Sequence, residues 1–165
     1  MSENNISSIM CGALAVMLIV GIVIGCGAKD SLSAAQKNLE SYDSIIESLP
    51  NDSYYAFADI GRTHDALLVT TSDLVFDNGD QTWAATEATV YGFDDNDNIR
   101  EYGKIEGGGT ATPLACKNGE LYVGGHNYMN KVYIDEDASE MLTVNGEFFD
   151  DYENATVVQF TQIYR

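Results

Sequence analysis

Basic residues are scarce in this sequence of 165 residues. Eight Lys and Arg stand against 26 Asp and Glu, which gives a formal net charge of −18 at pH 7. A surface of this sign repels the phosphates of nucleic acids and the headgroups of anionic lipids. Nucleic-acid binding is therefore disfavoured. The charge is compatible with solubility at a crowded cell surface, or with a basic peptide or a cation as the partner.

Cysteine and histidine are also rare, and the common catalytic motifs are missing. The cysteines are Cys11, Cys26 and Cys116, and the histidines are His64 and His126. Neither Gly-x-Ser-x-Gly nor His-Glu-x-x-His occurs, and the histidines lack the spacing of a metal site. Cys116 lies in an apolar run and is interpreted as a small buried hydrophobic side chain. We therefore predict no cofactor and no catalytic residue.

Charge is absent altogether from residues 9–28. About 20 apolar residues are enough to cross a bilayer as a helix, and a shorter apolar run that ends in small residues is typical of a secretory signal peptide. This run ends in Val23-Ile24-Gly25-Cys26, which resembles the lipobox of bacterial lipoproteins. The resemblance implies a signal peptide at residues 1–25, cleavage before Cys26 and a diacylglycerol on the Cys26 sulfur.

The same resemblance makes residues 26–31 a lipidated cysteine and a short tether, with acyl chains that hold the protein on the membrane. A second interpretation stays open. Signal peptides usually begin with Lys or Arg, whereas residues 1–8 contain neither and include Glu3, so the run is also compatible with a single uncleaved transmembrane anchor. Both interpretations place the chain from about residue 29 onward on the extracytoplasmic face of the cell membrane.

A helical pattern follows the apolar run. Apolar residues at 32, 35, 39, 42, 46 and 49 recur at spacings of three and four, which predicts an amphipathic helix over residues 32–50. Ser31 or Ser33 can cap its start, and Pro50 ends it. A single helix of this length is marginal in water, so we expect its apolar stripe to dock on the domain that follows.

Residues 53–165 have the pattern of an antiparallel β domain. The run 66–69 is apolar on both faces, which predicts a central strand, and alternation in 99–105 predicts that Ile99 and Ile105 face the core. Strand-like runs occupy 54–60, 66–69, 74–76, 83–93, 99–105, 110–116, 120–123, 127–134, 141–144, 147–149 and 155–164.

Asn-Gly pairs occur at 78–79, 118–119 and 145–146. This dipeptide favours the type I′ turn of a hairpin, whose two central residues need positive φ. The first two pairs lie about 40 residues apart, the size of a propeller blade, but two or three such units cannot close a ring. The predicted fold is therefore mainly β: a twisted antiparallel sheet, a small sandwich or a blade-like meander, with one N-terminal amphipathic helix laid on it.

Several segments of the β region resemble clostridial-type surface lipoproteins, an uncharacterised bacterial group similar to integrin-type FG-GAP repeats. The resemblance covers most of residues 54–137 and implies a largely β extracellular domain, with no catalytic residues. The segments that carry it are Tyr54 to Ile60 with Asp65 to Val69, Val90 to Asp94, Gly108 to Leu114, and Gly119 to Gly125.

Two acidic loops invite comparison with calcium sites. Members of the resembling group often carry an Asp-rich calcium loop at the position of residues 59–65, but here Gly61 has no side-chain ligand and Arg62 adds a positive charge. The turn that begins at Asp94 offers oxygen ligands at alternate positions and is a weak calcium candidate. We interpret it first as a solvated hairpin turn. Its candidate ligands are Asp94, Asn96 and Asn98.

Tyrosine, by contrast, is plentiful, with ten residues. Tyrosine is enriched where proteins meet partners, and it is equally suited to packing across strands. Glu120, Tyr122, His126 and Tyr128 fall on one face of the alternation and form the first candidate binding patch.

These features together indicate a membrane-anchored extracytoplasmic lipoprotein. Its β domain is predicted to bind an extracellular protein, peptide or carbohydrate without catalysing a reaction. Two alternatives stay open, a protective surface lipoprotein of the immunity type that masks a partner, and a hydrolase on the outer side of the membrane. The sequence does not indicate an oligomeric state.

Overall fold

The computed structural model describes residues 28–77, 82–108 and 112–164, and for residues 28–35 the description concerns the backbone only. The predicted signal peptide 1–25, Cys26 and the Asn78-Gly79 turn lie outside the described residues. In chain order the elements are α1 (Ala28–Ser48), β1 (Ser53–Ala58), β2 (Ala66–Thr71), the 3₁₀ helix η1 (Ser72–Leu74), β3 (Val75–Asp77), β4 (Trp83–Ala85), β5 (Glu87–Phe93), β6 (Ile99–Glu106), β7 (Ala115–Lys117), β8 (Glu120–Gly124), β9 (Met129–Asp135), β10 (Glu140–Val144), α2 (Phe149–Tyr152), β11 (Thr156–Val157) and β12 (Thr161–Gln162).

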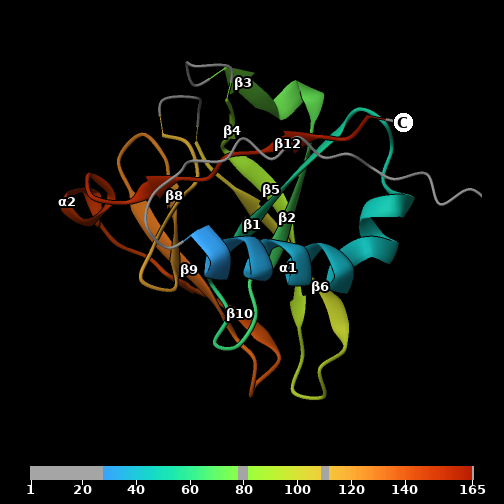
Figure 1. The fold of residues 1–165 in the computed structure, drawn as a ribbon. Helices are drawn as coiled ribbons and strands as arrows, with labels where there is room; N and C mark the ends of the chain where they lie inside the picture. Colours follow the sequence, from blue (N-terminus) through green and yellow to red (C-terminus); the bar gives the residue numbers. More distant parts are fainter. Residues whose placement is uncertain (1–27, 78–81, 109–111, 165) are drawn as a thin grey trace, which may run out of the picture.

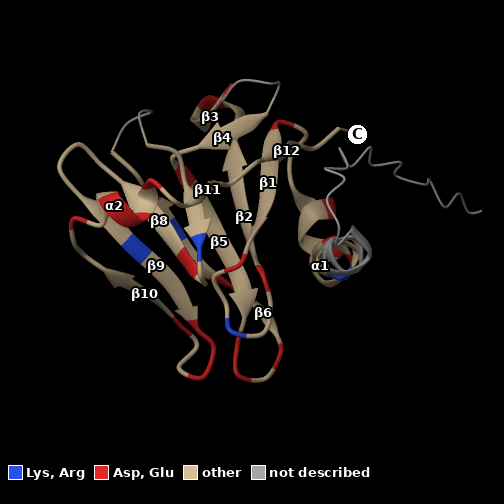
Figure 2. Cartoon of the chain, turned by 60° about the vertical axis from the view of Figure 1, so that its left-hand side comes forward, with Lys and Arg blue, Asp and Glu red and all other residues tan. Residues whose placement is uncertain are grey.

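Two five-stranded antiparallel sheets form most of the domain. The first has the order β12-β1-β2-β5-β6 and the second the order β10-β9-β8-β7-β11, while β3 and β4 make a separate two-stranded ribbon. Figure 2 shows the two sheets as layers, with α1 on the outer side of the first. The prediction of a mainly β, antiparallel fold with one long helix laid on it is confirmed, and of the predicted forms it takes that of a sandwich.

The main core lies between the two sheets. Alternate residues of each strand point inward, so that Ala88 and Val90 of β5 meet Leu121 and Val123 of β8 in one buried cluster. Burying the apolar faces of both sheets removes them from water, which stabilises the fold by about 25 cal/mol per Å² of apolar surface. β2 is buried on both sides as predicted, because Leu68 faces this core while Leu67 faces α1.

α1 docks its apolar stripe on the outer face of the first sheet, as expected. Leu39, Ile46 and Leu49 pack there around Tyr42, which is fully buried. The Tyr42 hydroxyl donates to the carbonyl oxygen of Asp65 at 2.9 Å. Burial, with a smaller contribution from the charge of Asp65, raises the pKa of Tyr42. The helix is therefore fixed to the sandwich by both apolar packing and a hydrogen bond.

The helix begins at Ala28, four residues before the predicted start at residue 32. No helix breaker occurs in Ala28-Lys29-Asp30. The prediction relied on the apolar stripe and so missed a first turn without large apolar side chains. Most of the segment expected to be a tether, residues 26–31, is consequently helical.

The C-terminal segment links the two sheets along one side of the sandwich (Figure 1). β11 pairs with β7 of the second sheet, and β12 pairs with β1 of the first. Between these strands the Val158 N–H donates to the Leu114 carbonyl at 2.9 Å, and the Phe160 N–H donates to the Trp83 carbonyl at 2.8 Å. The single strand predicted over 155–164 is thus two short strands separated by a crossing.

The predicted strand 83–93 is broken at Thr86. β4 pairs with β3, whereas β5 pairs with β2 and β6. The Thr86 carbonyl accepts a hydrogen bond from the Gly107 N–H at 2.9 Å. A strand that changes partners must interrupt its ladder, and alternation of side chains does not reveal such an interruption.

A β-bulge overturns the prediction for β6. Val90 pairs with Gly103 while Tyr91 pairs with Glu101, so that Tyr102 is an extra residue in the ladder. Gly103 has φ +114°, a conformation that favours glycine. Because the extra residue reverses the alternation, Ile105 lies in the main core while Ile99 packs on the side of α1. The expectation that both face one core is wrong.

Of the two described Asn-Gly pairs, one forms the predicted hairpin. Asn118 and Gly119 have φ of 53° and 80° and join β7 to β8, as a type I′ turn requires. Asn145-Gly146 does not turn the chain back. Instead the Gly146 carbonyl accepts from the Met129 N–H at 3.1 Å, and the chain runs on into α2. The strand predicted over 147–149 is therefore wrong.

Candidate functional site

Four connections gather at one end of the sandwich. They are residues 59–65 between β1 and β2, 94–98 between β5 and β6, 118–119 between β7 and β8, and 136–139 between β9 and β10. We call this region the loop end. Figure 2 shows acidic residues along its turns. Hydrogen bonds join three of these connections, 59–65, 94–98 and 136–139, and Gly119 of the fourth lines the same groove as Gly61 and Glu136.

A buried carboxylate organises the loop 59–65. Glu136 is 8% exposed, its Oε1 accepts from the Thr63 N–H at 3.0 Å, and its Oε2 accepts from the Thr63 hydroxyl at 2.7 Å. Burial by itself raises the pKa of Glu136, but these hydrogen bonds, with others from the N–H groups of His64 and Arg62, outweigh it, and the pKa lies below its ordinary value. The loop is therefore wrapped around a carboxylate that stays charged at neutral pH.

The absence of a side chain at Gly61 leaves space for the Glu136 carboxylate. A Cβ at this position would lie 2.4 Å from the His64 carbonyl oxygen and 2.7 Å from Glu136 Oε1. Any side chain here would have to displace the loop or the carboxylate. The sequence suggested only that Gly61 lacks a calcium ligand, whereas its contacts assign it a packing role. The backbone N–H groups of this loop face an anion, the opposite of the arrangement that holds a cation.

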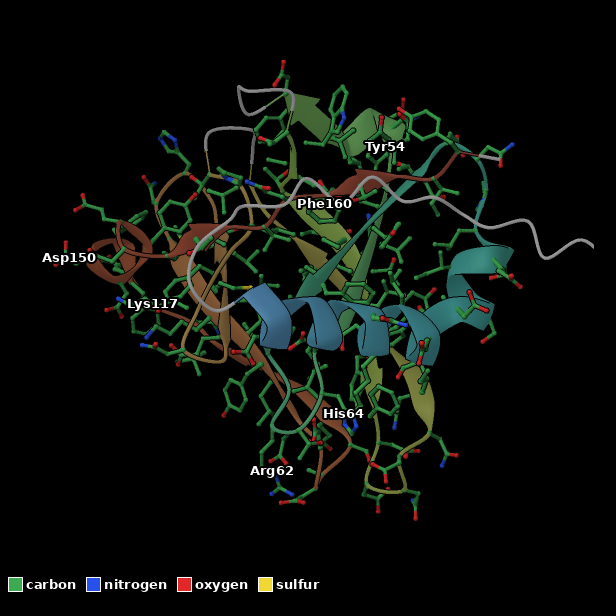
Figure 3. All side chains as sticks on the ribbon, viewed as in Figure 1. Tyr54, Arg62, His64, Lys117, Asp150 and Phe160 are labelled. Atoms are coloured by element: carbon green, nitrogen blue, oxygen red, sulfur yellow. The ribbon has the colours of Figure 1, made fainter. Side chains whose placement is uncertain are left out.

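The same loop is fastened to the first sheet and to α1. The His64 ring stacks on the Phe93 ring with centroids 4.2 Å apart, and its Nδ1 lies 2.8 Å from the Thr63 hydroxyl. The Asn38 amide donates to Asp65 Oδ2 at 2.6 Å. Figure 3 shows His64 and Arg62 together at this end of the molecule. His64 therefore lies in a turn at the surface and packs against the first sheet.

The turn proposed as a weak calcium candidate is held by its own hydrogen bonds. Asp94 Oδ1 accepts from the N–H groups of Asn96 and Asn98, each at 2.9 Å, and the Asn96 amide donates to Asp95 Oδ1 at 2.6 Å. The N–H of Asn98, followed by that of Asn96, lowers the pKa of Asp94. This is the hydrogen bonding of a capped hairpin turn. Calcium binding by Asp94, Asn96 and Asn98 stays a prediction.

This turn also contacts the neighbouring turn of the second sheet. The Asp95 N–H donates to the Ser139 hydroxyl at 3.3 Å, and that hydroxyl lies 3.4 Å from Asp95 Oδ1. Within the part of the chain that the structure describes, no group of three or more His, Cys, Asp or Glu is arranged to hold a metal ion.

A groove opens at the loop end beside β9. It has a volume of about 340 Å³, at the lower end of the range for small-ligand pockets. Its walls are largely apolar, and two glycines contribute no side chain to them. The lining residues are Ile60, Gly61, Arg62, Gly119, Tyr133, Ile134, Asp135 and Glu136.

The predicted binding patch is divided between two places. Tyr122 is only 2% exposed, and its hydroxyl lies 3.4 Å from Glu120 Oε2 on the outer face of the second sheet. His126 and Tyr128 lie in the connection between β8 and β9, at the opposite end from the loop end, and Tyr128 is 38% exposed. The four residues therefore do not share one exposed face. A binding role for His126 and Tyr128 stays a prediction.

A lysine cluster that the sequence pattern did not predict explains why Tyr122 is buried. Lys131 Nζ lies 3.0 Å from Glu120 Oε2 and 2.9 Å from Asp151 Oδ2, and 4.5 Å from the centre of the Phe148 ring. Hydrogen bonds, first to Asp151 and then to Glu120, raise the pKa of Lys131. The cluster fastens α2 to the sheet. The alternation of side chains along the strands predicts that Lys131 lies beside Tyr122. It does not predict that Asp151, which lies on α2, is a partner of Lys131.

Cys116 lies against a second cavity of about 340 Å³, which Asp59, Lys117, Asn118, Asn154 and Thr156 also line. Burial, followed by the charges of Asp59 and Asp65, raises the pKa of the Cys116 thiol to about 12. The thiol is therefore protonated and unreactive at neutral pH. Cys116 packs against the main core as an apolar side chain, but it is half-buried rather than buried as predicted.

The predicted lipidation site, Cys26, lies outside the described residues. Among residues 28–77, 82–108 and 112–164, no helix combines the length and apolar character needed to span a membrane. Comparisons of the chain with protein-family models, with curated proteins and with solved structures found no match.

Proposed function

We propose that this protein is a lipoprotein of the extracytoplasmic face of the cell membrane, anchored through Cys26, and that its sandwich is a non-enzymatic binding module. The anchor rests on the uncharged run at residues 9–28 and on its ending, Val23-Ile24-Gly25-Cys26. The resemblance of residues 54–137 to surface lipoproteins supports the same location.

The proposal that the sandwich binds a partner rests on the way the loops of the loop end are held in place. Binding residues are disproportionately found on loops that a rigid scaffold positions. Here the Glu136 carboxylate links the second sheet to Thr63 of the loop 59–65. The Ser139 hydroxyl links the same sheet to Asp95 of the turn 94–98. Loops ordered before binding lose less conformational entropy when a partner arrives. A surface that is already ordered and contains a groove is suited to recognition.

The anchor is tested with a pair of cysteine variants in the full-length protein. Cells that express the wild type, Cys26→Ser or Cys11→Ser are labelled with a palmitate analogue, and precursor size and membrane fractionation are recorded. We expect Cys26→Ser to lose the label and to stay at precursor size, because its hydroxyl cannot take the place of the alkylated thiol. Cys11→Ser, which lies in the same apolar run, should behave as the wild type.

A different pattern would support the alternative. If Cys26→Ser stays in the membrane with unchanged size and the wild type carries no label, the apolar run is an uncleaved transmembrane anchor and the lipoprotein proposal is wrong.

A further inference from the structure

We propose that the groove at the loop end binds a lysine or arginine side chain of a basic peptide. The inference rests on the proposed function, since it names the ligand class of the same surface. It follows from two properties of the groove, the apolar character of its walls and the sign of the charge around its mouth.

The walls suit a long aliphatic stem. Ile60 and Ile134, which are 1% and 4% exposed, form the floor of the groove, and the half-buried Tyr133 lies beside them. A side chain at Gly119 would meet no atom within 4 Å, so this glycine leaves open space at the groove. Lys and Arg bury their methylene stems along apolar surface and keep the charged group at the boundary with water. The Tyr133 ring can also attract a cation placed over its face.

The mouth supplies a carboxylate held in a fixed place. Asp135 lines the groove, and its Oδ1 accepts from the Ala138 N–H at 3.1 Å. Among the ion pairs of the described residues none includes Asp135. Glu136 also lines the groove, but its two oxygens accept from the loop 59–65. Asp135 is therefore the carboxylate best placed to meet a cationic ligand.

Acidic residues outnumber the cations at this end: the four connections contain seven Asp and Glu and one cation, Arg62, while Arg100 of β6 and Lys117 of β7 flank them. Arg62 lies at the groove and pairs with Asp137 through side chains that are both largely exposed, a contact that competes weakly with a ligand. Lys104 pairs with Glu87 and Glu106 on the strands rather than at the loop end. With a net charge of −18 over the chain, the field favours the approach of a basic peptide and disfavours an acidic one.

The test uses full-length protein in detergent micelles and three fluorescent heptapeptides, Gly-Ser-Gly-Lys-Gly-Ser-Gly and the same peptide with norleucine or glutamate at the centre. Norleucine keeps the stem and removes the charge. Binding is measured by fluorescence anisotropy for the wild type, Asp135→Asn and Tyr133→Ala. The matched control is Asp150→Asn, which removes the same charge from α2, away from Arg62 (Figure 3).

We expect the lysine peptide to bind best, and Asp135→Asn to weaken that binding about tenfold, the order typical of a lost charge-assisted hydrogen bond. Tyr133→Ala should weaken it too, and Asp150→Asn should not. Asparagine keeps an oxygen that can accept from Ala138, and thermal unfolding of each variant checks that the fold is intact.

Three results would overturn the proposal. One is equal binding of the norleucine and lysine peptides, another is an equal loss in Asp150→Asn and Asp135→Asn, and the third is no binding of the lysine peptide to folded wild type. All three are separate from the Cys26 labelling experiment, because they are read on purified protein whether or not it carries lipid. Loss of the anchor and loss of the ligand are therefore distinguishable.

Discussion

Among single residues, Glu136 is the group on which the loop end depends most. Glu136→Gln removes the charge that the N–H groups and the hydroxyl of the loop 59–65 face. We expect the free energy of unfolding at pH 7 to fall by about 1–3 kcal/mol, the range for weakening a buried, charge-assisted hydrogen-bond set. Because the pKa of Glu136 lies below its ordinary 4.5, its contribution is complete above pH 4.5 and is lost as the pH falls through the lower folded value.

The measurement is urea unfolding of both proteins between pH 7 and pH 2. The difference between wild type and variant should shrink towards the acid end of this range. Asp137→Asn is the neighbouring control, since Asp137 is exposed and pairs with an exposed Arg62, an arrangement worth less than about 1 kcal/mol. A pH-independent difference, or an equal effect of Asp137→Asn, would mean that the Glu136 charge does not stabilise the loop.

At the scale of elements, the docking of α1 can be divided into packing and hydrogen bonding at Tyr42. Tyr42→Ala leaves a cavity between helix and sheet and should lower the free energy of unfolding by about 3–5 kcal/mol. Tyr42→Phe keeps the packing but loses the hydrogen bond to the Asp65 carbonyl and the longer one, 3.5 Å, to the Tyr91 carbonyl. It should lower the free energy of unfolding by about 0.5–1.5 kcal/mol. Equilibrium unfolding checks both values. Asp43→Ala, on the exposed side of the same turn, should change stability by less than about 0.5 kcal/mol.

The elements themselves were largely predictable, because their signals are local. Period-two and helical patterns located most strands and the helix stripe, and Asn118-Gly119 located a hairpin. The failures at β6 and β4 have one physical cause, since a single extra residue at Tyr102 or a break at Thr86 changes the pairing without changing the local composition. The candidate site was harder still. Glu136 meets a hydroxyl 73 residues earlier in the chain, and no local pattern reports such a contact.

At the scale of the whole molecule, the early start of α1 changes how an anchored domain can behave. α1 begins at Ala28, so that only Gly27 separates Cys26 from a helix that packs on the sandwich through Tyr42. One residue reaches at most about 3.6 Å. If Cys26 carries the proposed lipid, the sandwich has almost no free linker, and its partner must come to the membrane surface.

The single tryptophan makes this testable. Trp83 is the only Trp in the chain, and its ring packs edge-on against the Tyr54 ring with centroids 5.6 Å apart, so its fluorescence anisotropy reports the motion of the domain. In vesicles, the lipidated wild type should keep a residual anisotropy at long times. A 20-residue Gly/Ser insertion between Gly27 and Ala28 should remove it, because a chain of that length spans roughly 25 Å and lets the domain tumble. The same insertion after Tyr164 is the control and should leave the decay unchanged. A wild-type decay as complete as that of the first insertion would show that α1 does not transmit the restraint of the anchor.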